Sequence, residues 1–140
     1  MHSKPVLGLD EARCALGAML DAATNVAGRP VALAVVDDHG DLVGFACMAG
    51  ANPALARQNA LKKAYTSACM RIDSGAFAKR MQTAGRTLAD FGSSDLILDA
   101  GGLVITRSRD GVVLGGIGVS GRSSEEDEEI ARAGRQALSL

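Results

Sequence analysis

Aromatic residues are scarce in this chain, which has one Tyr, three Phe and no Trp among its 140 residues. Its core must therefore be built from aliphatic side chains and Met. Neither sign of charge is in excess, because 15 Lys and Arg residues face 16 Asp and Glu residues. A surface without a basic field does not hold nucleic acid or an anionic membrane, so we expect neither as a partner.

Long apolar runs are also missing. No stretch is long enough to span a membrane, and residues 1–5 lack the apolar core of a signal peptide. The three cysteines, Cys14, Cys47 and Cys69, are odd in number and lie far apart within apolar patterns. Such cysteines are typical of buried thiols in a reducing compartment rather than of disulfides or a zinc site. We therefore expect a cytoplasmic protein without a metal site.

Glycine, by contrast, is abundant, with 17 residues, and its densest group follows an apolar run within residues 112–121. Gly116, Gly118 and Gly121 match the G-x-G-x-x-G pattern of dinucleotide-binding loops. Too few residues follow for the second strand and acidic residue that such a site needs, and the acidic helix start would repel a pyrophosphate. We therefore expect these glycines to allow close packing, and a serine of residues 123–124 to cap the next helix. Close contacts between small residues also occur between subunits, so we expect an oligomer.

Hydrophobic periodicity predicts four helices and two β-hairpins. The predicted helices cover residues 10–27, 53–71, 73 or 74 to 84, and 124–138, and the hairpin strands are 31–36 with 42–48 and 103–107 with 112–114. Alanine recurs every fourth residue from Ala56 to Ala68, so the second helix can lie very close to a sheet. Segregated antiparallel strands among helices predict an α+β fold. Residues 85–102 are the least regular stretch, and loops of this kind often carry sites.

Several motifs resemble a known family. Residues 34–43 (AVVDDHGDLV) resemble the A-V-V-D-x-x-G-x-L-V hairpin of the GlcG and HbpS haem-binding-protein-like family, and later signatures match residues 63–64, 101–105, 115–121 and 125–128. The resemblance covers nearly the whole chain. It implies one GlcG/HbpS-like domain over residues 1–140, with a profilin-like five-stranded antiparallel sheet flanked by helices, and assembly into homo-oligomers.

The resemblance also implies a small-molecule ligand, because some members of the family bind haem. Two departures weaken any transfer of the ligand's identity. Residues 45–51 (FACMAGA) carry small apolar groups where the family commonly has charged ones, and residues 101–105 (GGLVI) lack the proline of the usual G-G-L-P-I.

Candidate ligand-binding residues lie on the second helix and on the glycine turns. Lys63, which matches the family lysine, and Arg57 could hold a carboxylate or a haem propionate, although both could also be solvated on a helix surface. Gly101 and Gly102 are implied as binding residues by the resemblance.

The turn before the last helix is a further binding candidate. Backbone N–H groups at Gly118, Ser120 and Gly121 could hold an anion, although the carboxylates that follow oppose it.

The candidate catalytic residues are Lys63, Asp127 and His39. His39 is the only histidine after residue 2 and could ligate haem iron or transfer a proton, but a solvated turn residue is the commoner case. Asp127 could be a catalytic carboxylate, although its place at a helix start already explains it.

Two hypotheses follow. The first is an oligomeric module that binds a planar or anionic small molecule, for which the resemblance implies haem or another tetrapyrrole. The second is a small catabolic enzyme, an isomerase or lyase, in which Lys63 and Arg57 hold a carboxylated metabolite while Asp127 or His39 moves a proton. Few aromatic residues and histidines disfavour strong haem capture, and few acid and base groups disfavour the enzyme. We favour the binding module.

Overall fold

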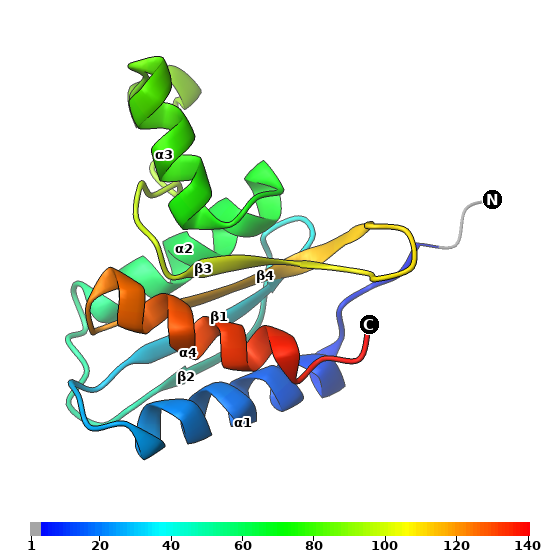
Figure 1. The fold of residues 1–140 in the computed structure, drawn as a ribbon, viewed down its shortest axis with the longest axis vertical. Helices are drawn as coiled ribbons and strands as arrows, with labels where there is room; N and C mark the ends of the chain where they lie inside the picture. Colours follow the sequence, from blue (N-terminus) through cyan, green and yellow to red (C-terminus); the bar gives the residue numbers. More distant parts are fainter. Residues whose placement is uncertain (1–3) are drawn as a thin grey trace.

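The computed structural model describes residues 4–140, which form an α+β fold with one antiparallel sheet (Figure 1). In chain order the elements are α1 (Leu9–Asn25), β1 (Ala32–Asp37), β2 (Leu42–Cys47), α2 (Ala56–Met70), α3 (Ser74–Ala84), the 3-10 helix η1 (Leu88–Phe91), β3 (Gly102–Thr106), β4 (Val113–Ser120) and α4 (Ser124–Gln136). The strands lie in the order β2-β1-β4-β3, and each neighbouring pair is antiparallel. The two predicted hairpins are therefore joined through β1 and β4, and the predicted α+β class is confirmed.

Within residues 4–140 the sheet has four strands, so the expectation of a profilin-like five-stranded sheet is wrong for this chain. The irregular stretch between α3 and β3 contributes η1 but no strand. In this stretch the Ile97 N–H donates to the Thr66 hydroxyl on α2 (3.0 Å) rather than to a neighbouring strand. A segment whose backbone bonds to a helix side chain in this way does not extend the sheet.

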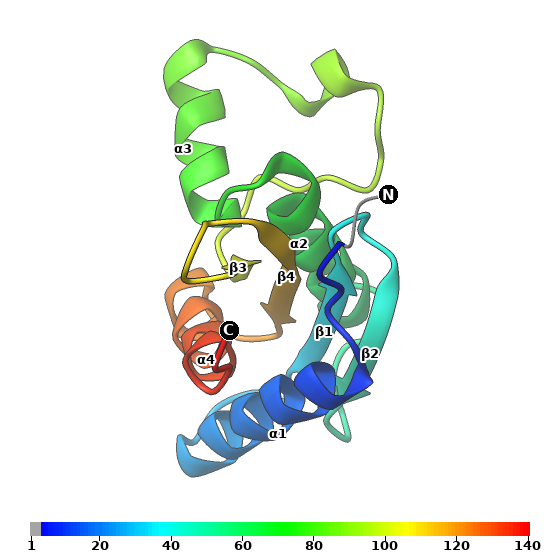
Figure 2. The ribbon, with the colours of Figure 1, turned by 90° about the vertical axis from the view of Figure 1, so that its right-hand side faces the viewer.

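The sheet is covered on both faces. Helices α1 and α4 lie on one face and α2 lies on the other, while α3 and η1 extend beyond the sheet past the end of α2 (Figures 1 and 2). Alternate residues of β1 therefore enter two cores: Leu33 and Val35 join the α1/α4 side, and Ala32 and Ala34 join the α2 side. This double coverage explains the continuous apolar run of β1. None of the helices described here is long and apolar enough to cross a membrane.

Helix α2 packs unusually close to β4, as the alanine spacing predicts. A Cβ atom built at Gly118 would lie 2.1 Å from the carbonyl oxygen of Ala60, and one at Gly116 would lie 2.4 Å from that of Ala64. Any side chain at these positions would push α2 away from the sheet. Gly116 and Gly118 thus serve helix packing, as expected, and not a nucleotide.

The helix starts follow local capping chemistry. The Ser123 hydroxyl accepts the Glu126 N–H (3.2 Å), and the Glu126 carboxylate accepts the Ser123 N–H (3.3 Å), so Ser123 caps α4 in a capping box. The prediction that the second helix begins at residue 53 is wrong, because residues 53–55 form a turn. There the Asn52 side chain accepts the N–H groups of Ala54 and Leu55, and the helix begins at Ala56.

The cysteines are more accessible than expected. Cys14 and Cys47 are exposed, Cys69 is half-buried, and all three are free thiols. Cys47 ends β2, and because β2 is an edge strand its end lies open. The prediction of burial is therefore wrong for Cys14 and Cys47.

Candidate functional site

Lys63 is among the largest side chains fully buried in the described residues, with 1% of its surface exposed. Its ammonium group donates to the Asp127 Oδ2 atom (3.1 Å) and to the Val119 carbonyl (3.0 Å), and the Asp99 Oδ2 atom lies 3.6 Å away. A lysine on α2 is thereby joined to the end of β4, to the first turn of α4 and to the loop before β3. A charge removed from water requires such partners, because it is otherwise strongly destabilising.

Two glycines make room for this lysine. A Cβ atom built at Gly101 would lie 2.8 Å from the Lys63 ammonium nitrogen, and one at Gly102 would lie 2.3 Å from the Lys63 carbonyl oxygen. Gly101 also has φ +124°, a conformation that other residues rarely adopt. Gly101 and Gly102 therefore contact the lysine directly, which accounts for glycine at both positions.

Asp127 shares the first turn of α4 with its capping residues and is 1% exposed. Its Oδ1 atom accepts the Arg122 N–H (3.0 Å) while Oδ2 accepts from Lys63. Burial raises the pKa of the Asp127 carboxyl, and the charge of Lys63 and the bond from Arg122 oppose that rise. The expected helix-start role of Asp127 is thus combined with an ion pair to Lys63.

Arg122 is a buried cation that the sequence did not suggest. Its Nε atom donates to the Arg29 carbonyl (2.8 Å) and its Nη2 atom to the Ala23 carbonyl (2.8 Å), so it fastens the last turn of α1 and the chain after it to the β4–α4 turn. Gly28 lies against it, since a Cβ atom there would be 2.6 Å from Nε. An arginine beside glycines is usually solvated, so its burial cannot be predicted from the sequence. Arg122 is buried because the end of α1 packs against this turn.

A cavity of about 370 Å³ opens above the Lys63–Asp127 pair, and we call it the Lys63 cavity. Its polar lining includes Arg29, Asn52, Asn59, Lys63, Asp99, Ser120, Arg122 and Asp127. Asp99 also accepts the Ser124 hydroxyl (2.5 Å), and 41% of its side chain is exposed. Asp99 was not predicted as a site residue, although it lies in the irregular stretch that the sequence marked as a place for sites.

The predicted site residues separate into two groups. Lys63, Asp127, Ser120 and Gly121 line the cavity, whereas Gly118 lies under Ala60 of α2. The structure thus brings together the helix lysine, the turn and the α4 carboxylate.

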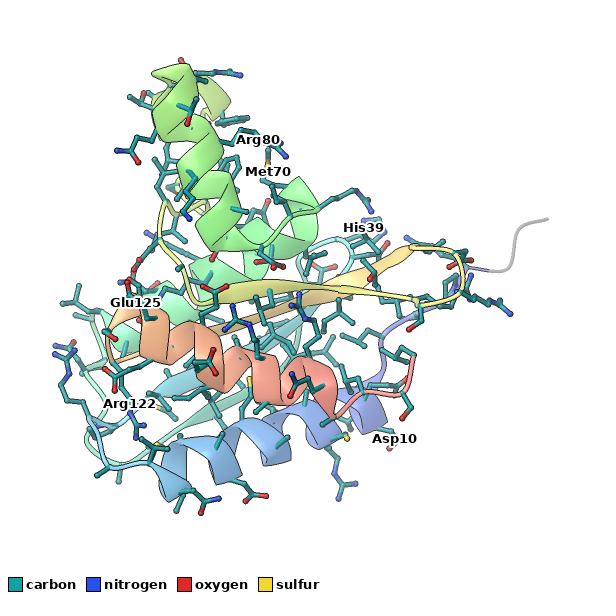
Figure 3. All side chains as sticks on the ribbon, viewed as in Figure 1. Asp10, His39, Met70, Arg80, Arg122 and Glu125 are labelled. Carbon is teal, nitrogen blue, oxygen red and sulfur yellow. The ribbon has the colours of Figure 1, made fainter. Side chains whose placement is uncertain are left out.

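Arg57 and His39 lie elsewhere. Arg57 is exposed and does not line the cavity, because six helical residues place it about 120° around α2 from Lys63. His39 is on the β1–β2 turn, at the other end of the sheet from Arg122 (Figure 3), where its Nε2 atom lies 2.9 Å from the Lys4 ammonium. The expected set of Lys63, Arg57, Asp127 and His39 therefore does not assemble; only its lysine and aspartate meet.

The side chains that usually ligate haem iron are His, Cys, Met and Tyr. None of these residue types lines the Lys63 cavity within residues 4–140. The cavity offers hydrogen-bonding groups and charges instead, so its residues do not fit haem ligation.

The chain is similar to several proteins of known structure. No curated protein matches the chain. An HbpS double mutant from Streptomyces reticuli is similar at 33% identity, with 100% of this chain and 92% of that chain covered and a TM-score of 0.88. PduOC, solved in complex with haem, is similar at 26% identity, with 96% of both chains covered and a TM-score of 0.85. The Klebsiella pneumoniae protein ORFY shares the fold at 22% identity, with 98% of this chain and 95% of that chain covered and a TM-score of 0.81.

The family model described as haem degrading protein HbpS-like matches residues 7–136. The resemblance that residues 34–43 and 115–121 indicated is thereby confirmed. The chain belongs to the HbpS-like family.

Proposed function

We propose that this protein binds a small molecule and that haem or another tetrapyrrole is that ligand. One observation carries the proposal: the chain matches PduOC, whose structure contains haem, over 96% of both chains. The description of its family by haem degradation supports the same ligand.

The residues that best fit haem lie beside the β1–β2 turn and not in the Lys63 cavity. His39 exposes 71% of its side chain there, and iron would take the place that the Lys4 ammonium holds beside its Nε2 atom. A hollow of about 280 Å³ next to the turn is lined by Leu42, Leu61 and Tyr65, with Lys62 and Asp95 among the lining residues, while His39 lies outside this lining. Haem would bring a redox-active iron; His39 would ligate it, the apolar residues would contact the porphyrin and Lys62 would pair with a propionate.

Haem titration followed by visible absorption tests this proposal. The protein should give a saturable shift of the main haem band, and His39→Ala should abolish that shift because it removes the iron ligand. Asp99→Asn serves as the control, since it alters the Lys63 cavity and should leave the spectrum unchanged. A wild-type protein without a saturable shift would contradict haem binding, and an unaltered spectrum in His39→Ala would exclude His39 as the ligand.

A second candidate function is a small isomerase or lyase acting on a carboxylated metabolite. The observation that favours it is the buried Lys63–Asp127 pair beside a polar cavity, with the pKa of Asp127 raised by burial, because perturbed groups of this kind cluster at catalytic sites. Asp127 would move the proton, without help from Arg57 or His39. Proton NMR in D₂O should then show exchange of a hydrogen next to the substrate carboxyl group, and Asp127→Asn should stop it.

We also propose that the protein is cytoplasmic and forms a homo-oligomer. The free thiols at Cys14, Cys47 and Cys69 suit a reducing compartment. Strand β2 is an edge of the sheet and carries Leu42 with 55% of its surface exposed, which a second copy of the chain could cover. Sedimentation analysis should show a species larger than the 14.3 kDa chain.

A further inference from the structure

Ser120 presents to the Lys63 cavity a hydroxyl that has no hydrogen-bond partner within residues 4–140. Ser120 ends β4, is only 6% exposed and lines the cavity. Its hydroxyl makes no hydrogen bond within residues 4–140, yet no fully enclosed side-chain oxygen or nitrogen in that range lacks a partner. The Ser120 hydroxyl therefore opens onto the cavity. A hydroxyl that opens onto a cavity bonds to water there, and a ligand that supplies an equivalent hydrogen bond can replace that water.

The wall formed by α2 and the turn before it adds further donors. The Asn52 Oδ1 atom accepts two backbone N–H groups, which leaves the amide NH₂ of this side chain free to donate. Asn59 is half-buried, lines the cavity and has no hydrogen-bond partner for its amide within the described part of the chain. Hydrogen-bonding groups thus face the same space from β4 and from the α2 side.

Positive side chains outnumber negative ones in the lining of the Lys63 cavity. Three cations, Lys63, Arg29 and Arg122, line it together with two carboxylates, Asp99 and Asp127. Both carboxylates lie within 4 Å of Lys63, whereas the ion pairs formed within residues 4–140 include neither arginine. One positive charge is therefore left over.

Glu126 is a carboxylate outside the cavity whose charge interacts with both arginines. Glu126 is held by Ser123 in the α4 cap and does not line the cavity. Its pKa is lowered chiefly by Ser123, with smaller contributions from Arg122 and Arg29.

We infer that the Lys63 cavity binds a small monoanion that also carries hydroxyl groups. Its anionic group takes up the positive charge of Arg29 and Arg122, and its hydroxyl groups bond to Ser120, Asn59 and the half-exposed Asp99. This site is separate from the proposed haem site, and it names a ligand class for the second candidate function without requiring catalysis.

Three probes of similar size separate charge from hydrogen bonding: glycerate has both an anionic group and hydroxyls, propionate lacks the hydroxyls, and glycerol lacks the charge. Each is titrated into the ¹⁵N-labelled full chain while amide signals are followed by NMR. Glycerate should cause saturable shifts at Ser120 and Gly121. Propionate and glycerol should each bind roughly 5- to 10-fold more weakly, because propionate loses the hydrogen bonds of the hydroxyl groups and glycerol loses the charge-assisted hydrogen bonds of the anionic group.

Two variants assign the binding to these residues. Ser120→Ala should weaken glycerate about 5-fold and leave propionate unchanged, because it removes one hydrogen bond. Arg29→Gln, at an exposed position, should weaken both anions and leave glycerol unchanged. Ser94→Ala, in an exposed turn that does not line the cavity, is the matched control and should change nothing.

The inference is overturned by equal binding of all three probes, by glycerate shifts that avoid Ser120 and Gly121, or by no glycerate binding at millimolar concentration. If Ser120→Ala does not fold, Arg29→Gln decides the result alone, and equal glycerate affinity in that variant and in wild type overturns the inference. Haem titration reports on a different site and different residues, so failure there leaves this result intact.

Discussion

Replacing Lys63 by Met tests the buried ion pair most directly. Met keeps most of the length and the apolar character of the lysine stem but removes the charge, which leaves the Asp127 carboxylate buried beside an apolar group. Removing one partner of a buried pair typically costs about 3–5 kcal/mol. Because an ordinary domain is stable by only about 5–15 kcal/mol, Lys63→Met should lose a large part of the free energy of unfolding.

Chemical unfolding of four proteins measures this cost as a cycle. The variant Asp127→Asn keeps an acceptor for the Arg122 N–H, and the double variant Lys63→Met/Asp127→Asn leaves no unpaired charge at that aspartate position. The double variant should therefore be more stable than Lys63→Met alone, although it carries one substitution more. Lys62→Met, one residue earlier on α2 and half-exposed, is the control and should stay within about 0.5 kcal/mol of wild type.

The free energy of unfolding should also depend on pH through the Asp127 carboxyl. Burial raises the folded-state pKa of Asp127 above its unfolded value, so the protonated form folds more readily. The stability linked to this group is fully present below the unfolded pKa and is lost as pH rises through the folded pKa. In Lys63→Met the attraction that opposes the rise is gone, so the pKa rises further and the deficit relative to wild type should shrink as pH falls. A deficit equal to that of Lys62→Met, or one independent of pH, would refute this account.

Two further predictions concern packing and an exposed ion pair. Gly118→Ala should destabilise the protein by about 1–3 kcal/mol in thermal or chemical unfolding, because its Cβ atom would meet the Ala60 carbonyl. Gly17→Ala, in open space on α1, should instead stabilise the protein by roughly 0.5–1 kcal/mol. Similar effects at both sites would contradict the close contact of α2 with β4. Asp110 has its pKa lowered to about 2, chiefly by hydrogen bonds from Arg107, so any stability from this pair is fully present above the ordinary pKa of 3.8 and is lost as pH falls through about 2. Carboxyl NMR titration should place its midpoint there and show a return toward 3.8 in Arg107→Gln, and an ordinary midpoint in wild type would count against the pair.

Much of the fold can be predicted from the sequence because it depends on local rules. The alternation of turns and apolar runs locates both hairpins, and the alanine spacing of α2 indicates its close approach to the sheet. The first turn of α4 is set by the serine and glutamate of a capping box. The missing fifth strand could not be predicted from residues 85–101, because their backbone bonding depends on Thr66 of another element.

The site was predictable only in part. Lys63, Ser120 and Asp127 were candidates because of their residue types and their positions in motifs. Asp99 and Arg122 were not, since an aspartate and an arginine beside glycines are usually solvated. They become site residues because folding brings the loop before β3 and the chain after α1 to the end of β4.

By itself, the sequence determined the α+β class, the antiparallel hairpins, the cap of α4 and the family, because each depends on residues close together in the chain or on short motifs. The tertiary structure decided that Lys63 is buried, that Asp99 and Asp127 surround it, and that His39 lies at the far end of the sheet. These outcomes depend on the order β2-β1-β4-β3 and on the packing of α2 against β4. Contacts between distant segments form only when the whole chain is folded, so no local pattern could specify them.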